Sequence, residues 1–288
     1  MYYAIILTSV LMYGVCFALR DVYRKMRGSS LRISMESSLF GAVAGALVLL
    51  CLNGFRLSFT PFTLWISLVA AINVLAFSFF SFKALDRIDL SLFSVFSMLG
   101  GMVLPFLQGV LFYREPITLA KGVAVVLITA ALALTVTRDK KGTGYIYYIG
   151  IFVLNGMSGV ITKLFNELPF EKTGATDYSV WMSLWTVLLS GLALLALSRK
   201  REAAELRFTW RACGVGSLCG ALNTVANMML VVALLHVDAS VQYPMVTGGV
   251  MIVSTLISLF GSRKPDKRAL LAVAVAFIGT LAIFVIPI

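Results

Sequence analysis

The chain has 288 residues, of which 60% are hydrophobic and only 13% are charged, and its mean hydropathy is +0.95. This composition excludes a soluble globular fold, because a water-exposed surface needs more charge than this chain carries. The net charge of +11 does not indicate nucleic-acid binding. The basic residues lie in short loops between apolar runs, where retention of Lys and Arg on the cytoplasmic side of a membrane explains them.

Ten apolar runs follow one another along the chain, each about the length that a helix needs to cross a bilayer. A backbone in lipid must be helical or form a closed barrel, and alternating ten-residue strands are absent, so we predict an all-α polytopic membrane protein. The first run has no positive charge before it, which distinguishes it from a signal peptide. The predicted spans are residues 2–19, 34–52, 62–82, 91–112, 119–137, 145–165, 178–198, 211–235, 240–261 and 269–287.

Lys and Arg are distributed unevenly among the nine loops that join these spans. When basic residues close to a span end are counted with the adjacent loop, the odd-numbered loops hold 19 of the 24 and the even-numbered loops hold 5. By the positive-inside rule the odd loops are cytoplasmic and both termini lie outside. The basic-rich loop follows the first span of the first half but the second span of the second half, as two five-span units inserted in opposite orientations require.

The two halves of the chain also resemble each other in sequence, at an offset of about 145 to 150 residues. The third and eighth spans match best, with small, branched and amide positions in register, whereas the first and sixth spans share only a Gly-Val pair. The matching segments are 67–76 with 217–226, 84–91 with 233–240, Gly100-Gly101 with Gly248-Gly249, and Gly14-Val15 with Gly159-Val160.

We therefore predict two domains, a first five-helix repeat over residues 1–140 and a second over residues 141–288. An odd number of spans in each repeat makes the two halves antiparallel. Two related but opposed units can exchange between outward-open and inward-open states around a site near the bilayer midplane. The pattern is typical of secondary transporters.

With these features the chain resembles the EamA-like, ten-span transporters of the drug/metabolite transporter superfamily. The resemblance rests on the five-plus-five duplication, on Asp89-Leu90-Ser91 at the start of the fourth span, on Pro105 within it, and on residues 111–115 before Pro116. It implies secondary transport of small metabolites, often export. A glutamate usually closes the fourth span in such families. Here Arg114 precedes Glu115, and the second copy, residues 261–263, has no acid.

Polar groups inside the spans are the first candidates for a substrate site, because a bilayer tolerates them only when they face a cavity or a partner. Asn73 and Asn223 occupy equivalent positions in the two repeats, and we expect them to face each other near the centre. They would contact substrate or form an interhelical hydrogen bond that holds the halves together. Asn227 lies one turn beyond Asn223 and is a further candidate.

The fourth and ninth spans each combine a proline with polar side chains. Gln108 follows Pro105 by three residues, and Gln242 and Tyr243 stand directly before Pro244. Because proline removes a backbone donor and loosens a helix, we expect the two prolines to act in gating and the polar side chains to contact substrate.

Asn155 and Lys163 complete the candidate site, both in the sixth span. Asn155 lies beside Gly156 and Gly159, which favours close helix packing. Lys163 would either extend to the membrane surface or point inward, where it would favour anionic substrates. No Asp or Glu lies in the middle of a span, which disfavours proton-coupled export of cations.

The sequence thus predicts a multi-pass carrier of the bacterial inner (plasma) membrane that moves a small neutral, zwitterionic or anionic metabolite, such as an amino acid or organic acid, by alternating access. No catalytic arrangement is present, so we expect no enzyme and no metal or other cofactor. The alternatives are a flippase of a lipid-linked amphiphile and a non-transporting membrane partner. We expect a monomer or homodimer, since Gly41-x-x-x-Gly45 would pack a helix of this chain or of another.

Overall fold

The computed structural model describes residues 2–113, 127, 145–198, 209–234, 236–237, 239–260, 265 and 267–285. Within these ranges the regular structure is entirely helical, with no strand. The predicted fifth span, residues 119–137, lies outside the described residues except for position 127. The helices are α1 (Tyr2–Arg27), α2 (Leu31–Leu52), α3 (Pro61–Leu85), α4 (Leu90–Tyr113), α6 (Tyr145–Glu167), α7 (Ala175–Ser198), α8 (Trp210–Leu234), α9 (Ala239–Leu259) and α10 (Lys267–Val285).

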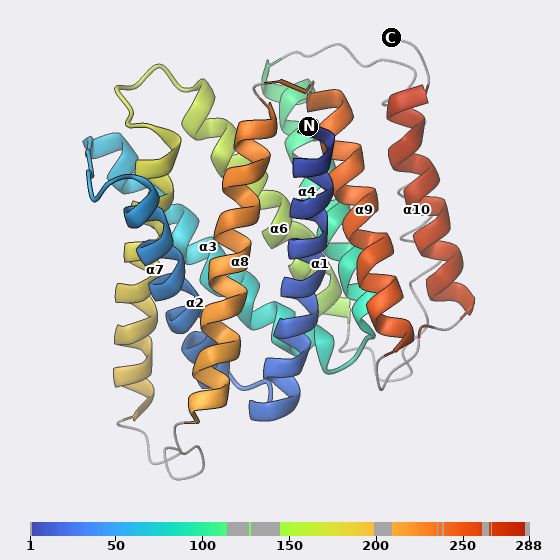
Figure 1. Cartoon of the computed structure of the whole chain (residues 1–288), viewed down its shortest axis with the longest axis horizontal. Helices are drawn as coiled ribbons and strands as arrows, with labels where there is room; N and C mark the ends of the chain where they lie inside the picture. Colours follow the sequence, from blue (N-terminus) through green and yellow to red (C-terminus); the bar gives the residue numbers. More distant parts are fainter. Residues whose placement is uncertain are drawn as a thin grey trace.

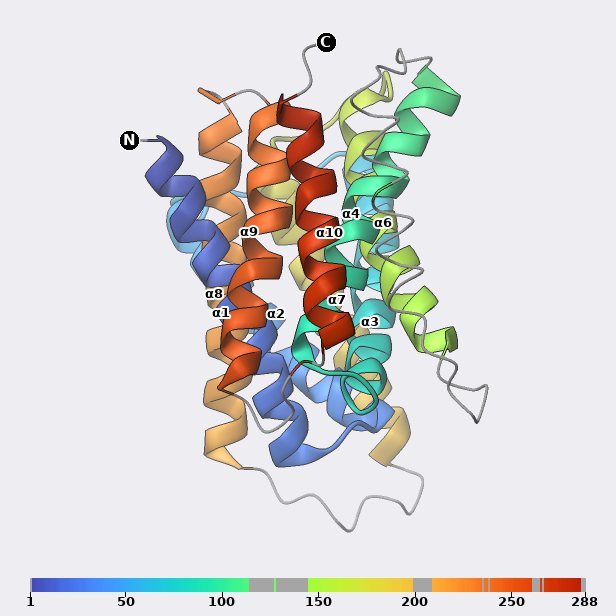
Figure 2. The same cartoon turned by 90° about the vertical axis from the view of Figure 1, so that its right-hand side faces the viewer.

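The helices lie side by side in one bundle, with their axes roughly parallel or antiparallel (Figures 1 and 2). The N-terminus lies at the upper end of Figure 1, and α1 and α3 finish at the lower end, where α2 and α4 begin. Polar caps set several helix starts. The Ser30 and Thr60 hydroxyls accept from the backbone N–H three residues on, at 3.4 and 3.2 Å, and the Asp89 carboxylate accepts from Leu92 N–H at 3.0 Å.

Membrane-spanning character is evident from helix length and surface. Seven helices of the described chain are long and apolar enough to cross a bilayer: α1, α2, α3, α4, α6, α7 and α8. Large apolar side chains also cover their outer faces, and Trp65, Leu111 and Leu195 are 70%, 71% and 66% exposed. Such a surface is costly in water and favourable in hydrocarbon, so the fold is that of an α-helical membrane protein.

Interhelical packing gives each half of the chain its neighbours in the other half. α1 packs against α8 and α9, and α6 packs against α3 and α4. α2 packs against α7 and α8, α7 also contacts α3, and α4 contacts α9. The main apolar core, which includes Ile6, Phe17, Phe93, Ile151 and Val250, lies between helices from both halves.

Glycines allow two of these helix pairs to approach closely. A Cβ at Gly220 of α8 would overlap the backbone of Gly41 on α2, and a Cβ at Gly156 of α6 would lie 2.6 Å from the Gly100 carbonyl oxygen on α4. The Gly41-x-x-x-Gly45 motif therefore packs a helix of this same chain. Gly45 contacts Thr224, one turn beyond Gly220.

Candidate functional site

One stripe of α1 carries the polar side chains that meet α8. Tyr13 donates its hydroxyl hydrogen to Asn227 Oδ1 at 2.8 Å. One turn further along α1, Cys16 Sγ lies 3.4 Å from the Cys219 carbonyl oxygen, and Cys219 Sγ lies 3.5 Å from the Cys16 carbonyl oxygen. These contacts hold the two helices in register over the middle of the bundle.

Asn223 lies on the interior side of α8 and remains exposed. It stands one turn beyond both Cys219, which contacts α1, and Gly220, which contacts Gly41 on α2. The side chain of Asn223 therefore lies between the face of α8 that contacts α1 and the face that contacts α2. Asn227, one turn further on, is also exposed although Tyr13 contacts it. We call Tyr13, Asn223 and Asn227 the α1–α8 polar cluster.

Arg20 lies two turns below Tyr13 on the same stripe of α1. Its guanidinium Nη1 donates to Ser81 Oγ on α3 at 3.2 Å, and its Cζ lies 5.2 Å from the centre of the Phe77 ring. Ser81 in turn donates to the Phe77 carbonyl oxygen at 2.6 Å. Arg20 thus crosses from α1 to α3 on the inside of the bundle and does not extend to the membrane surface.

The structure does not bring Asn73 and Asn223 together. Asn73 is only 7% exposed, and its Nδ2 donates to the Leu154 carbonyl oxygen and to Ser158 Oγ on α6, both at 2.9 Å. Asn223 has no hydrogen-bond partner within the described part of the chain. α3 packs on α6 and α8 packs on α1, so the two amides form no hydrogen bond with each other. That they face a common central site stays a prediction.

The candidates on α4 and α6 are mostly packed between helices. Asn155 donates to the Ser97 carbonyl oxygen at 2.6 Å, which joins α6 to α4. Pro105 lies against Gly159, and α4 continues through it as one helix. Gln108 is 6% exposed, and its Oε1 accepts no hydrogen bond from the described residues. Lys163 is half-buried and interacts with a neighbouring group.

The side chains of the three candidates on α9 lie outside the described part of the structure. The backbone of Gln242, Tyr243 and Pro244 belongs to α9, but the positions of their side chains lie outside the described part of the structure. Their predicted roles in substrate contact and gating stay predictions.

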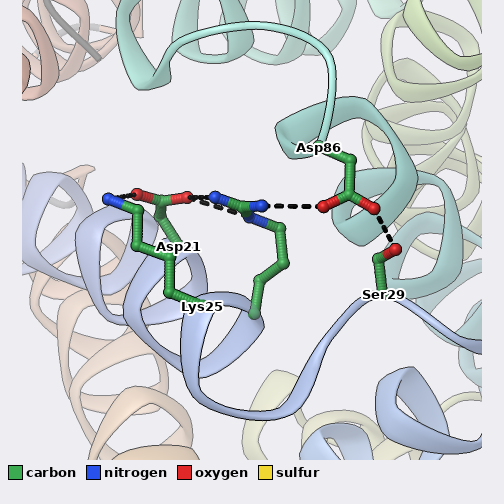
Figure 3. Close-up of polar contacts among 5 residues, drawn as sticks. Asp21, Lys25, Ser29 and Asp86 are labelled. Atoms are coloured by element: carbon green, nitrogen blue, oxygen red, sulfur yellow. Dashed lines mark hydrogen bonds and ion pairs between the residues drawn. The ribbon is translucent and has the colours of Figure 1, made fainter. Parts of the chain in front are cut away.

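An ionic network joins α1 to α3 at the lower end of the bundle (Figure 3). Arg24, which is 9% exposed, pairs with Asp21 at 2.8 Å and with Asp86, the C-cap of α3, at 2.7 Å. Lys25 pairs with the second oxygen of Asp21 at 2.6 Å, and Ser29 donates to the second oxygen of Asp86. We call these five residues the lower ionic network.

A second buried pair connects α1 to α2 beside this network. Arg27 binds Glu36 at 2.8 Å, with side chains 7% and 12% exposed, and Tyr23 donates to the same carboxylate at 3.0 Å. A cavity of about 220 Å³ opens at this end between α1, α4 and α9, and Asp21 and Lys25 line it. Three helices are thus fastened at their lower ends by charge-assisted hydrogen bonds.

Tyr13 and Arg20 were not among the residues that sequence reasoning selected. Arg20 was assigned to the basic loop after the first span, where it serves topology, and Tyr13 was one of ten tyrosines with nothing to single it out. Their spacing of seven residues, with Cys16 between them, places all three on one helix face. That spacing was the available signal.

The comparison with known proteins supports the helical fold and gives no information about activity. No protein-family description matches the chain, and no curated protein matches it. Among solved structures, one described as a crystal structure of a protein superposes with a TM-score of 0.57. The match covers 95% of this chain and 96% of that chain at 16% identity, so the helical arrangement occurs in another protein of similar extent.

Proposed function

We propose that the chain is a secondary transporter that moves a small metabolite across the plasma membrane by alternating access. In this proposal ten spans form two inverted five-helix repeats of the EamA-like kind, and the α1–α8 polar cluster contributes the substrate site. The lower end of the bundle is cytoplasmic and both termini lie outside, in agreement with the distribution of Lys and Arg.

Equivalent helix contacts support the repeat. Gly14 of α1 lies against Val253 of α9, and Gly159 of α6 lies against Pro105 of α4. Val253 and Pro105 each stand four residues beyond a Gly-Gly pair, and the two glycines come from the matched Gly-Val pairs. Each contact is therefore the counterpart of the other when α1 exchanges with α6 and α9 with α4. A second pair of contacts follows the same rule, Gly249 with Val10 and Gly101 with Asn155.

The observation that carries the transport proposal is the different environment of two equivalent amides. The side-chain amide of Asn73 donates hydrogen bonds to two acceptors on α6, so it stabilises the bundle. At the equivalent position, Asn223 is exposed on the interior side of α8, because Tyr13 reaches past it to Asn227. An interior amide without a structural partner is costly in a membrane protein unless it binds something that enters from water.

The lower ionic network suits the moving unit of such a carrier, because it fastens helices of one repeat to each other. Arg24 and Asp86 bind the end of α1 to the end of α3 below the polar cluster. Since α1 and α3 belong to the same proposed repeat, they would move together against α8 and α9 of the other repeat. The network would therefore stay intact while the cytoplasmic side opens between the two repeats.

Counterflow in proteoliposomes tests the proposal. Vesicles carrying the purified protein are loaded with one unlabelled compound class at a time and exposed to the same labelled class: amino acids, organic acids, purines or sugar phosphates. We expect exchange of one class above protein-free vesicles. Exchange of no class, by protein whose helix content is intact, would contradict the proposal, and labelled-lipid translocation would then favour the flippase.

A further inference from the structure

The charge of Arg20 has no counter-ion within the described chain, although it lies inside the bundle. Its partners are a neutral hydroxyl, Ser81 Oγ at 3.2 Å, and the Phe77 ring. Of the five N–H donors of a guanidinium, this geometry occupies one. The remaining donors are available to an acceptor that is not part of the described protein.

The acidic groups nearest in sequence and space are engaged elsewhere. Asp21 binds Arg24 and Lys25, and Asp86 binds Arg24 and Ser29. Glu36 binds Arg27 and Tyr23. Arg24 and Arg27 thus have carboxylates, whereas Arg20, one turn closer to the middle of the membrane, does not. A buried or half-buried cation of this kind is stabilised by an anion that binds to it.

The neutral groups above Arg20 define the other end of the site. Tyr13 lies seven residues earlier on α1, about 10 Å along the helix axis, and Asn223 lies near the level of Cys16 between them. The exposed amides donate and accept hydrogen bonds but carry no charge. The interior faces of α1 and α8 therefore present one cation at the lower end and uncharged polar groups at the upper end.

We propose that Arg20 binds the carboxylate of a monocarboxylate substrate, whose polar but uncharged far end is held by Asn223, Asn227 and Tyr13. This inference rests on the proposed function and specifies its substrate class. A planar guanidinium with free N–H donors matches a carboxylate in a two-point geometry. A dianion, such as a phosphate ester or dicarboxylate, would leave a second charge against neutral amides, which is unfavourable away from water.

Two measurements on purified protein test this assignment. Thermal stabilisation in detergent reports binding, and counterflow reports transport. The probes are 4-hydroxybutyrate and N-acetylglycine, the primary amides of both acids, and glycerol 3-phosphate. We expect the acids to stabilise and to exchange, and the amides and the phosphate ester to be at least about tenfold weaker, since they lack the singly charged carboxylate that the guanidinium fork matches.

Three variants separate the role of Arg20 from general effects of charge. R20Q should lose acid binding and exchange by about tenfold or more, while R20K, which keeps the charge but not the fork, should retain part of both. Arg211 is exposed in the first turn of α8 at the same end of the bundle, so R211Q is the matched control and should behave as wild type.

The outcomes distinguish the two proposals. Equal binding of acids and amides by the wild type, or full acid binding by R20Q, would overturn the carboxylate site. Exchange of neutral compounds alone would keep the transport function and reject Arg20 as the substrate-binding group. Acid binding that R20Q loses, without any exchange, would keep the site and reject transport.

Discussion

Close packing of α8 on α2 predicts opposite effects for two glycines of the same helix. A Cβ at Gly220 would lie 2.5 Å from the Gly41 carbonyl carbon and closer still to its Cα and oxygen, whereas a Cβ at Gly214 meets nothing within 4 Å. Ordinary contact begins near 3.4 Å, so G220A requires α2 and α8 to separate by about 0.9 Å or more. The neighbouring atoms are backbone, which cannot rotate away.

The magnitude follows from two opposing terms. Overpacking of this kind costs up to about 3 kcal/mol, and replacing a helical glycine by alanine returns about 0.5–1 kcal/mol. We therefore expect G220A to lower the free energy of unfolding by about 2 kcal/mol and G214A to leave it unchanged or raise it slightly.

Reversible unfolding in mixed micelles, followed by helical circular dichroism, measures both variants against the wild type. The comparison is internal, because both substitutions are Gly→Ala in α8 and differ only in what the new methyl group meets. Equal stability of G220A and wild type, or an equal loss in G214A, would refute the packing of Gly220 on Gly41.

Two further substitutions test the lower ionic network and the role of Asn73. D86N removes one carboxylate partner of Arg24, and because Asp86 is 37% exposed, it should lower the free energy of unfolding by only about 1 kcal/mol. Reversible unfolding in mixed micelles measures the change, and unaltered stability would contradict a stabilising pair between Arg24 and Asp86. N73A should cost about 1–2 kcal/mol of stability without changing substrate preference, and a changed preference would contradict its structural role.

Much of the fold could be predicted from the sequence because lipid imposes simple rules. A membrane helix must satisfy its backbone internally and present apolar side chains outward, so span length and hydropathy suffice to locate it. The prediction of a helical membrane protein was confirmed, and the predicted third span, residues 62–82, lies within α3 (Pro61–Leu85). The ten-span count and the repeat stay predictions, since they depend on more than hydropathy.

Side-chain partners were harder to predict than helices. Asn73 and Asn223 look alike in the sequence, yet one is buried against α6 and the other is exposed. The difference depends on what α1 and α6 present to them, a tyrosine at position 13 and a serine at position 158. A tyrosine side chain extends about one helical turn further than a serine side chain. Neither hydropathy nor residue spacing reveals which partner it will contact.

The most direct test of a transport site in the α1–α8 polar cluster is proteoliposome counterflow of N223A beside N73A, with equal amounts of folded protein in each vesicle preparation. Asn223 has no structural partner among the described residues, and Asn73 has two acceptors on α6. We predict that the wild type exchanges one class of small metabolite, that N223A loses this exchange, and that N73A keeps it despite lower stability. Unchanged exchange by N223A, or exchange lost only in N73A, would contradict this account of the site.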